Sequence, residues 1–461
     1  MNKSKIIFLE FNELCPALLD QWMSEGRLPN FKRFFEDSEI YTTESDEQNG
    51  PLLEPWIQWY SMHTGLSFEQ HGVFHLTDGP KAAHPDIWQI LLANGNTVGN
   101  CSSMNTRGFE AEGSFFLPDP WCTTEKAFPP ELQTFQDVVA QQVQQYSNSD
   151  QTLSRGDYIR FLSFLLSHGF RIKTAVAILR QLITDRLDKQ ESWRRAVLLD
   201  QLQFDVFQHY FRKYQPDFST FFLNSTAHYQ HSYWRHMAPE AFSVQPTEQE
   251  RRRYGGAILF GYQSMDKLLG DFFRLASGKA MLILATAISQ QPFLKREGSG
   301  GQHFYRPRNF ESVLGSLGIH AREVLPVMTH QFSLSFSNQG EAQHAQAKLE
   351  SISCQGKQVF DFAPSKPDAL YIGCQIYSPL ASDAKVEMGN GCSVPFFDLF
   401  YAMGALKSGC HHPDGVLWVK SGKHEVHPKK LSILEVLPML LRHYGLSDQR
   451  AEVVRTAGSN L

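Results

Sequence analysis

Residues 6–34 read IIFLEFNELCPALLDQWMSEGRLPNFKRF, and this stretch indicates the kind of fold that the chain adopts. It begins with a short run rich in aromatic and β-branched residues, which predicts a strand over 5–11. Apolar residues three and four positions apart then predict an amphipathic helix over 17–23. A strand followed directly by a helix is the repeating unit of a sheet with parallel strands.

The same alternation continues along the chain, with two interruptions. Further strands are expected at 39–43, 97–101, 218–224 and 280–286, and helices near 56–63, 86–93 and 247–275. The fold class predicted is α/β, a mostly parallel sheet between helices, with a helical insertion and a small β-leaning cap. The expected division is core over 1–124, helical insertion over 125–213, core over 214–321, cap or insertion over 322–380, and core completed over 381–461.

Composition excludes several classes of protein. The chain has 461 residues, 42% of them hydrophobic and 20% charged, and a formal net charge of −5, so it gives no electrostatic case for binding nucleic acid or an anionic membrane surface. No stretch is apolar for long enough to predict a membrane span, and the first apolar run ends at Glu10, too early for a signal peptide. The seven cysteines are scattered without a C-x-x-C pair, which predicts reduced thiols and a cytoplasmic location.

Six segments, in this order, resemble the alkaline phosphatase superfamily, in particular its branch of type I phosphodiesterases and nucleotide pyrophosphatases. The opening stretch resembles the first strand and helix of that branch, and 54–74 (EPWIQWYSMHTGLSFEQHGVF) resembles its nucleophile helix with the T-G-x5-H-G ending. The other four are 87–99 (IWQILLANGNTVG), 221–234 (FFLNSTAHYQHSYW), 409–422 (GCHHPDGVLWVKSG) and 431–446 (LSILEVLPMLLRHYGL). The resemblance implies hydrolysis of a phosphate or sulfate ester at a pair of divalent ions, usually zinc, with a Ser or Thr nucleophile.

The resemblance also implies that this site has lost several of its parts. The nucleophile position is Pro55, which has no hydroxyl group, and the Asp of the Asp-x-x-x-His segment is Ala227. The Asp-His pair expected after the strand at 281–289 falls on Ala287 and Ile288. At most one divalent ion is therefore expected, with zinc the candidate, or none.

The ligand positions that remain are Glu10, His231 and His411, and a hydrogen-bonded pocket histidine is an equal alternative for the two histidines. His228 shares a helix face with His231 and is a further candidate ligand, although the sequence alone favours a surface position for it. Glu54 directly precedes Pro55 and is a candidate general base, although a carboxylate before a helix-starting proline is also favoured for its effect on the helix dipole. The polar side chains expected to contact substrate are Asn12, Gln290, Gln291, His303 and Arg306. A structural salt bridge is an equal alternative for the arginine loop that contains Arg306.

Two functions follow from this pattern. The first is a divergent hydrolase of a phosphate or sulfate ester, on a small molecule or a glycan, that does not use the two-metal Ser/Thr mechanism. The alternative is a non-catalytic pseudoenzyme that binds a glycan, nucleotide or protein partner in the old cleft. Nucleic acid is not an expected partner, and the sequence does not indicate an oligomeric state.

Overall fold

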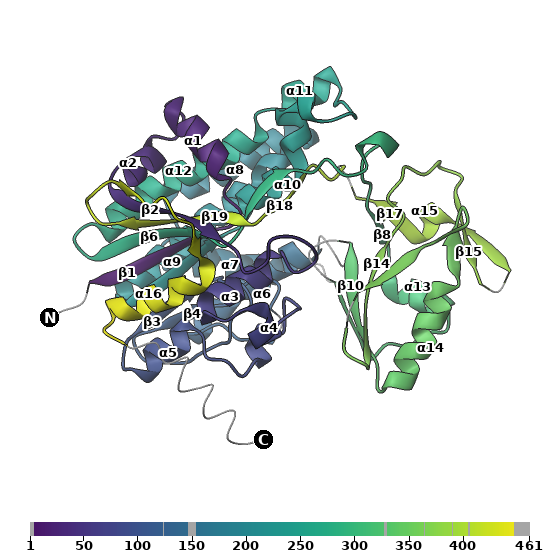
Figure 1. The fold of residues 1–461 in the computed structure, drawn as a ribbon, viewed down its shortest axis with the longest axis horizontal. Helices are drawn as coiled ribbons and strands as arrows, with labels where there is room; N and C mark the ends of the chain where they lie inside the picture. The colour runs from purple at the N-terminus through teal and green to yellow at the C-terminus, as the bar shows by residue number, and fades with distance from the viewer. Residues whose placement is uncertain are drawn as a thin grey trace.

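The computed structural model describes residues 4–122, 124–145, 154–326, 330–363, 365–389, 391–403 and 406–446. A nine-stranded sheet forms the larger part of the molecule, with helices on both of its faces, and a smaller unit lies beside it (Figure 1). The strand order is β20-β2-β19-β6-β1-β5-β3-β4, with β21 also paired to β2. β19 runs against its neighbours β2 and β6, and the other pairings of the sheet are parallel.

The bounds of the strands agree with those predicted from the sequence to within one residue where a strand was expected. The strands of the sheet are β1 (Lys5–Phe11), β2 (Ser38–Glu44), β3 (Val98–Cys101), β4 (Phe115–Leu117), β5 (Phe218–Leu223), β6 (Ala280–Thr286), β19 (Asp414–Lys420), β20 (Glu425–Val426) and β21 (Leu431–Ser432). The predicted α/β fold class, with mostly parallel strands between helices, is confirmed.

β1 lies in the middle of the sheet, paired in parallel to β5 and β6. Its side chains alternate between the two faces, as the pleat of a strand requires. Ile7, Leu9 and Phe11 belong to one hydrophobic core, and Ile6 and Phe8 belong to the other. By the same alternation Glu10 points to the face of Ile6 and Phe8.

The two cores are covered by different helices. Side chains from α1 (Pro16–Ser24), α2 (Pro29–Phe35), α9 (Ala196–Tyr214), α10 (Ser225–Met237) and α12 (Ala257–Ala276) fill the first core. Side chains from α3 (Pro55–Thr64), α5 (Ile87–Ala93) and α16 (Val436–His443) fill the second. The helix predicted over 247–275 is interrupted at Gly255 and Gly256, so that α11 (Glu248–Tyr254) precedes α12.

The described residues from 133 to 214 are mostly helical, as the periodicity of this part of the chain predicts. After β4 the chain forms α6 (Gln133–Gln145), α7 (Arg155–Ser167), α8 (Ile172–Leu187) and then α9, with no described strand between them. α9 packs on the sheet through aromatic side chains such as Phe204 and Phe207, which contact Phe221 of β5. α8 contributes almost nothing to this core.

The smaller unit, called the cap here, has its own hydrophobic core, which extends from Tyr305 to Phe400. It contains two four-stranded antiparallel sheets, β13-β14-β10-β9 and β12-β11-β15-β16, and the pair β17-β8. Its strands are β8 (Tyr305–Pro307), β9 (Glu323–Pro326), β10 (Gln331–Ser335), β11 (Ile352–Cys354), β12 (Lys357–Gln358), β13 (Phe360–Ala363), β14 (Ala369–Cys374), β15 (Lys385–Met388), β16 (Cys392–Pro395) and β17 (Phe400–Ala402), and its helices are α13 (Phe310–Ser316), α14 (Gln339–Glu350) and α15 (Phe396–Leu399). Among the described residues, no helix is long and apolar enough to cross a bilayer.

The cap meets the larger unit near the loop that follows α4 (Phe68–His71). The rings of Phe74 and His75 from that loop contact Tyr371 of β14, with centroids 6.1 and 5.1 Å apart. A cavity of about 130 Å³ lies between the two units beside these rings. Trp56 of α3 lines this cavity, so the cavity adjoins the beginning of the helix that Glu54 precedes.

Candidate metal centre

The carboxylate at the centre of the site is Glu13, in the turn between β1 and α1. Its backbone adopts a left-handed conformation with φ of 59°, which is uncommon for a residue other than glycine. Such strain persists only where the surroundings hold the residue firmly. Gln230 does so by donating from Nε2 to the Glu13 carbonyl oxygen at 2.6 Å.

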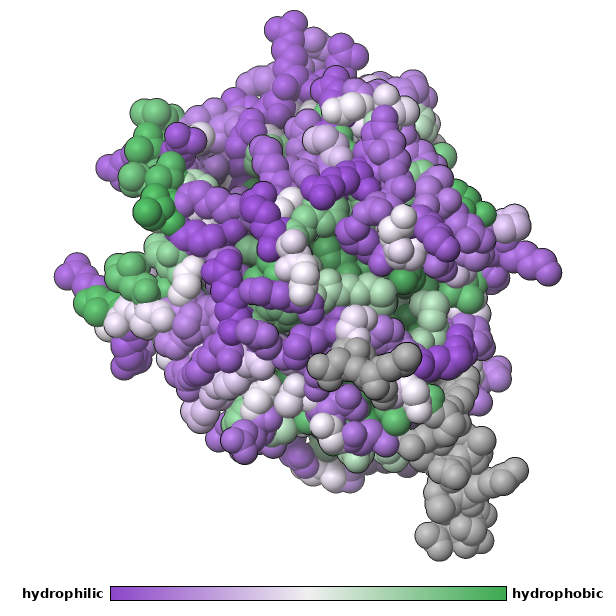
Figure 2. Space-filling view, turned by 90° about the vertical axis from the view of Figure 1, so that its left-hand side faces the viewer, coloured by the Kyte–Doolittle hydropathy of each residue, from purple (hydrophilic) through white to green (hydrophobic). Residues whose placement is uncertain are grey.

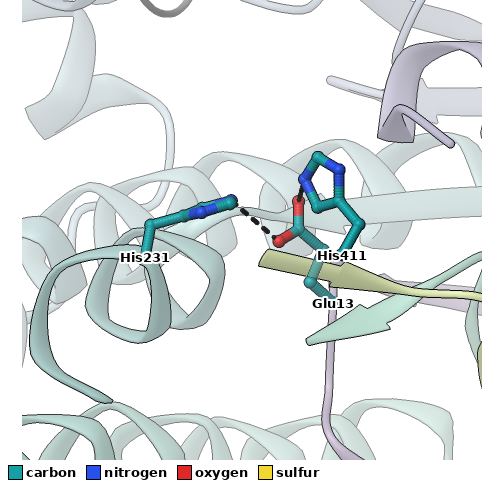
Figure 3. Close-up of side chains that lie close together, drawn as sticks. All are labelled: Glu13, His231 and His411. Atoms are coloured by element: carbon teal, nitrogen blue, oxygen red, sulfur yellow. Dashed lines mark ion pairs between the residues drawn. The ribbon is translucent and has the colours of Figure 1, made fainter. Parts of the chain in front are cut away.

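Two imidazoles from distant parts of the sequence lie on this carboxylate (Figure 3). His231 lies on α10, which follows the parallel neighbour β5, and its Nε2 is 3.1 Å from Oε2 of Glu13. His411 lies on β18 (Gly409–His412), which pairs with β7 (Ser289–Pro292), and its Nε2 is 3.6 Å from Oε1 of Glu13. The three segments meet beyond the carboxyl ends of β1, β5 and β6, where open α/β sheets form their sites.

The distances fit a single metal ion. One ligand atom from each of Glu13, His231 and His411 can be chosen so that all three lie within 4.8 Å of one another, and this is the one such group among the described residues. Two ligand atoms on a tetrahedral zinc ion with bonds of about 2.0–2.1 Å are separated by about 3.3 Å. The observed 3.1 Å from His231 to Oε2 and 3.6 Å from His411 to Oε1, the other oxygen of the same carboxylate, lie on either side of that value.

The hydrogen bonds of the imidazoles leave the inner nitrogen of each ring directed at the carboxylate. Nδ1 of His411 is 2.7 Å from the Leu53 carbonyl oxygen, and Nδ1 of His231 is 3.4 Å from that of Gly409. A carbonyl oxygen only accepts, so Nδ1 donates from each ring. Where a cation takes the place of the hydrogen bond between Nε2 of His231 and Glu13, the neutral ring offers that cation the lone pair of Nε2. This is the tautomer that a metal-binding histidine requires, held by a hydrogen bond from its second nitrogen.

The charge state of the cluster suits a cation. Burial lowers the pKa of His411 to about 4, although the Glu13 carboxylate opposes this shift, so the ring is neutral at pH 7. Burial alone would raise the pKa of Glu13, but His231, His411 and the hydrogen bonds from His231 and Gln290 lower it to about 2. At neutral pH the cluster therefore presents an ionised carboxylate and a neutral imidazole.

The expected contact residues Asn12 and Gln290 hold the centre in place. Asn12 donates from Nδ2 to Oε1 of Glu13 at 3.1 Å, and its own Oδ1 accepts from Trp59 Nε1 at 2.8 Å. Gln290 donates from Nε2 to Oε2 of Glu13. Both side chains are buried, so they position the carboxylate instead of facing a substrate.

Glu54 stands beside the centre, at the N-terminus of α3. Its Oε2 is 3.6 Å from Nδ1 of His411. Burial raises the pKa of Glu54 to about 8, with Lys407 opposing the shift and Glu13 adding to it. Lys407 lowers the pKa values of both Glu54 and His411, so its ammonium group lies within electrostatic reach of the centre. The sequence did not point to this cation.

Glu10, the carboxylate expected from the sequence, is not part of the cluster. It points to the opposite face of the sheet, where Oε1 is 2.7 Å from Nε2 of His63 on α3. Both side chains are buried, and the rings of Trp59 and Trp88 flank the imidazole. The carboxylate of the cluster is instead Glu13, just past the end of the strand, and its place at the carboxyl edge was the signal that could have identified it.

The remaining candidates contribute no side-chain atom to the cluster of Glu13, His231 and His411. His228 is exposed on α10, one turn before His231, and Gln291 is exposed and donates to the His411 carbonyl oxygen at 3.1 Å. Arg306 is buried in the cap with its guanidinium 5.0 Å from the centroid of the Phe332 ring. The half-buried His303 bonds through its backbone to Tyr377. Ala227, Ala287 and Ile288 are buried and supply no ligand atom.

Among known proteins, the chain is similar to solved structures but matches no family model and no curated sequence. Among solved structures, the chain is similar to phosphonoacetate hydrolase from Sinorhizobium meliloti 1021 in complex with phosphonoformate (14% identity, 94% of each chain, TM-score 0.44). It is also similar to murine ectonucleotide pyrophosphatase/phosphodiesterase 5, an inactive variant in complex with AMP (9%, 96% of each chain, 0.41), and to a mutant of alkaline phosphatase PafA (13%, 97% of each chain, 0.46).

These proteins are of the kind that the sequence motifs resemble. The identities of 9 to 14% and the TM-scores below 0.5 nevertheless assign neither a family nor an activity to this chain. We therefore base the functional proposal on the geometry of the site.

Proposed function

We propose that the chain is a divergent hydrolase of a phosphate or sulfate ester that works with one divalent ion, zinc being the candidate, and without a covalent enzyme intermediate. The observation that carries the proposal is the convergence of Glu13, His231 and His411 on one point. Three protein ligands with a position left open are the arrangement of catalytic zinc sites. When bound, the ion would supply Lewis-acid charge to the ester and to the attacking water.

A direct attack by water is supported by the residues around the centre. Pro55 occupies the position where the resembled enzymes carry their nucleophile, and proline has no hydroxyl group to form a phospho-enzyme or sulfo-enzyme. Glu54, the residue before it, has a carboxyl group at the mouth of the site and is our candidate for the proton transfer. Lys407 supplies positive charge for an anionic ester.

Metal content is the first test. After loading and dialysis, we expect elemental analysis to find one divalent ion per chain, removed by a chelator. The second site of the resembled enzymes should stay empty, because Ala287 and Ile288 have no ligand atoms and Glu10 is bound to His63. Two ions that survive dialysis against a chelator would contradict the proposal.

The course of the reaction is the second test. The loaded protein should hydrolyse an activated phosphate or sulfate ester with inversion at the central atom, because a single displacement by water inverts it. A phosphorylated or sulfated residue trapped within 54–64 would contradict the direct mechanism. If the loaded protein turns over no activated ester, the alternative gains support, which is a pseudoenzyme that binds a glycan, nucleotide or protein partner beside the centre.

A further inference from the structure

The helical insertion exposes an unusual amount of apolar surface on α7 and α8. Ten large hydrophobic side chains of these helices face solvent, among them Leu166 with 69% of its surface exposed, Ile172 with 85% and Leu187 with 83%. The others are Tyr158, Ile159, Leu162, Val176, Leu179, Leu182 and Ile183. Figure 2 shows hydrophobic side chains protruding at the left margin, which corresponds to the rear of Figure 1, where α7 and α8 lie.

α8 turns its apolar side chains to solvent, whereas an ordinary surface helix turns them toward the core. Five of its exposed apolar residues, Ile172, Val176, Leu179, Ile183 and Leu187, recur at intervals of three and four and so form one stripe along the helix. The buried positions are Thr174 and Asp185, and Asp185 accepts hydrogen bonds from Gln181 and Arg195.

This orientation is fixed by polar contacts, so the helix cannot simply rotate its apolar stripe inward. Rotation would expose the ion pair between Asp185 and Arg195 and bury the basic side chains Arg180 and Arg186. Contiguous exposed apolar surface of this kind marks a site of interaction with another molecule or with a membrane. The charge around the stripe indicates which of these it is.

Residues 154–190 are basic in a chain that is acidic overall. They contain seven Lys or Arg and three Asp, a net charge of +4, against −5 for the whole chain. The three acidic side chains are already engaged: Asp157 with Arg160, Asp185 with Arg195 and Asp188 with Arg253. Arg171 and Lys173 pair with Asp205 and Asp271 outside this range. The exposed Arg155, Arg180, Arg186 and Lys189 have no ion pair among the described residues, which leaves positive charge beside the stripe.

We propose that the apolar stripe of α8, with the basic residues that flank it, docks on an anionic lipid bilayer. A helix with an apolar face bordered by Lys and Arg lies in the interface, where the apolar side chains enter the acyl boundary and the cations meet the headgroups. A second copy of the chain fits less well, because a two-fold contact centred on the stripe would bring Arg180 and Arg186 against their own equivalents. The low net charge of the whole chain conceals this local patch.

The test uses the full chain and vesicles of phosphatidylcholine with and without about one third phosphatidylglycerol. We expect co-sedimentation with the anionic vesicles, weakened by salt, and little with the neutral ones. The double variant Leu179→Glu/Ile183→Glu should bind at least about tenfold more weakly, because it places charge in the apolar interface. Arg180→Glu/Arg186→Glu should lose most of the preference for phosphatidylglycerol.

Leu294→Glu is the matched control, because Leu294 is 52% exposed and lies outside α7 and α8. It should bind as the unchanged chain does, and thermal unfolding should show that all the variants are folded. Equal sedimentation of the unchanged chain with and without anionic vesicles would overturn the proposal. So would a dimer in light scattering that Leu179→Glu/Ile183→Glu dissociates, since a second copy would then cover the face.

Discussion

Two acidic residues three positions apart, Glu10 and Glu13, have opposite surroundings. Glu10 is inside β1, points to the face covered by α3, and meets the single imidazole of His63 within an apolar shell. Glu13 is beyond the end of the strand and meets His231 and His411, whose rings are 5.2 Å apart. The first is a closed pair buried in the core, and the second is a cluster whose histidines keep partial access to solvent.

This difference shows that a contact between a carboxylate and a histidine does not by itself indicate a metal site. At 2.7 Å the pair of Glu10 and His63 has the shorter distance, yet it offers one imidazole and no room for a substrate. The Glu13 cluster has longer distances and converging lone pairs, which is what a cation requires. Position at the carboxyl edge of the sheet, and not residue type, distinguishes the two.

The largest expected effect is on the closed pair. His63→Ala leaves the Glu10 carboxylate buried without its partner, which should lower the free energy of unfolding by about 3–5 kcal/mol. His231→Ala, at a side chain that is 36% exposed, should change it by less than about 1 kcal/mol. Chemical denaturation of both variants measures this, and equal losses would contradict the division into a structural and a binding pair.

Glu13→Gln should abolish the metal affinity that we assign to the open cluster. Outer-shell changes alone weaken metal binding by about 10–100-fold, so loss of the one anionic ligand should exceed roughly a hundredfold. Glu10→Gln is the matched control and should leave affinity unchanged. Calorimetric titration with zinc separates the two, and a large effect from Glu10→Gln would show that the ligand is the residue expected from the sequence.

His411 should make the metal-free protein sensitive to acid. Its pKa falls from 6.5 in an unfolded chain to about 4 in the fold, so the unfolded state binds more protons between these values and stability is lost as pH falls through them. The contribution is on the order of 2 kcal/mol. Denaturation at pH 7 and at pH 4.5 should show a smaller acid-induced loss in His411→Gln, and an unchanged loss would contradict a neutral buried ring.

The smallest expected effect comes from the residues that hold Glu13. Gln290→Ala removes the amide that donates to Oε2 and should weaken zinc binding about tenfold. Gln291→Ala changes an exposed neighbour with the same side chain and should leave binding nearly unchanged. Similar effects from both variants would mean that Gln290 does not position the carboxylate.

The sequence by itself determined many elements of the sheet and two of the three residues of the centre. Strand and helix periodicity predicted β1, α1, β5 and β6, because alternation and helical spacing are local properties of the chain. The helical insertion was likewise readable from its periodicity. His231 and His411 were singled out by the motifs that they occupy, and the structure brings their rings together.

Only the tertiary structure decided which carboxylate joins them. The sequence favoured Glu10 because it occupies the position in the strand where the resembled enzymes carry a metal-binding carboxylate. The face of the sheet to which that side chain points depends on the register of strands that come from segments hundreds of residues apart. The structure also showed that the apolar stripe of α8 faces outward. Periodicity identifies an amphipathic helix and cannot say which of its faces is buried, because polar contacts such as Asp185 with Arg195 decide that in three dimensions.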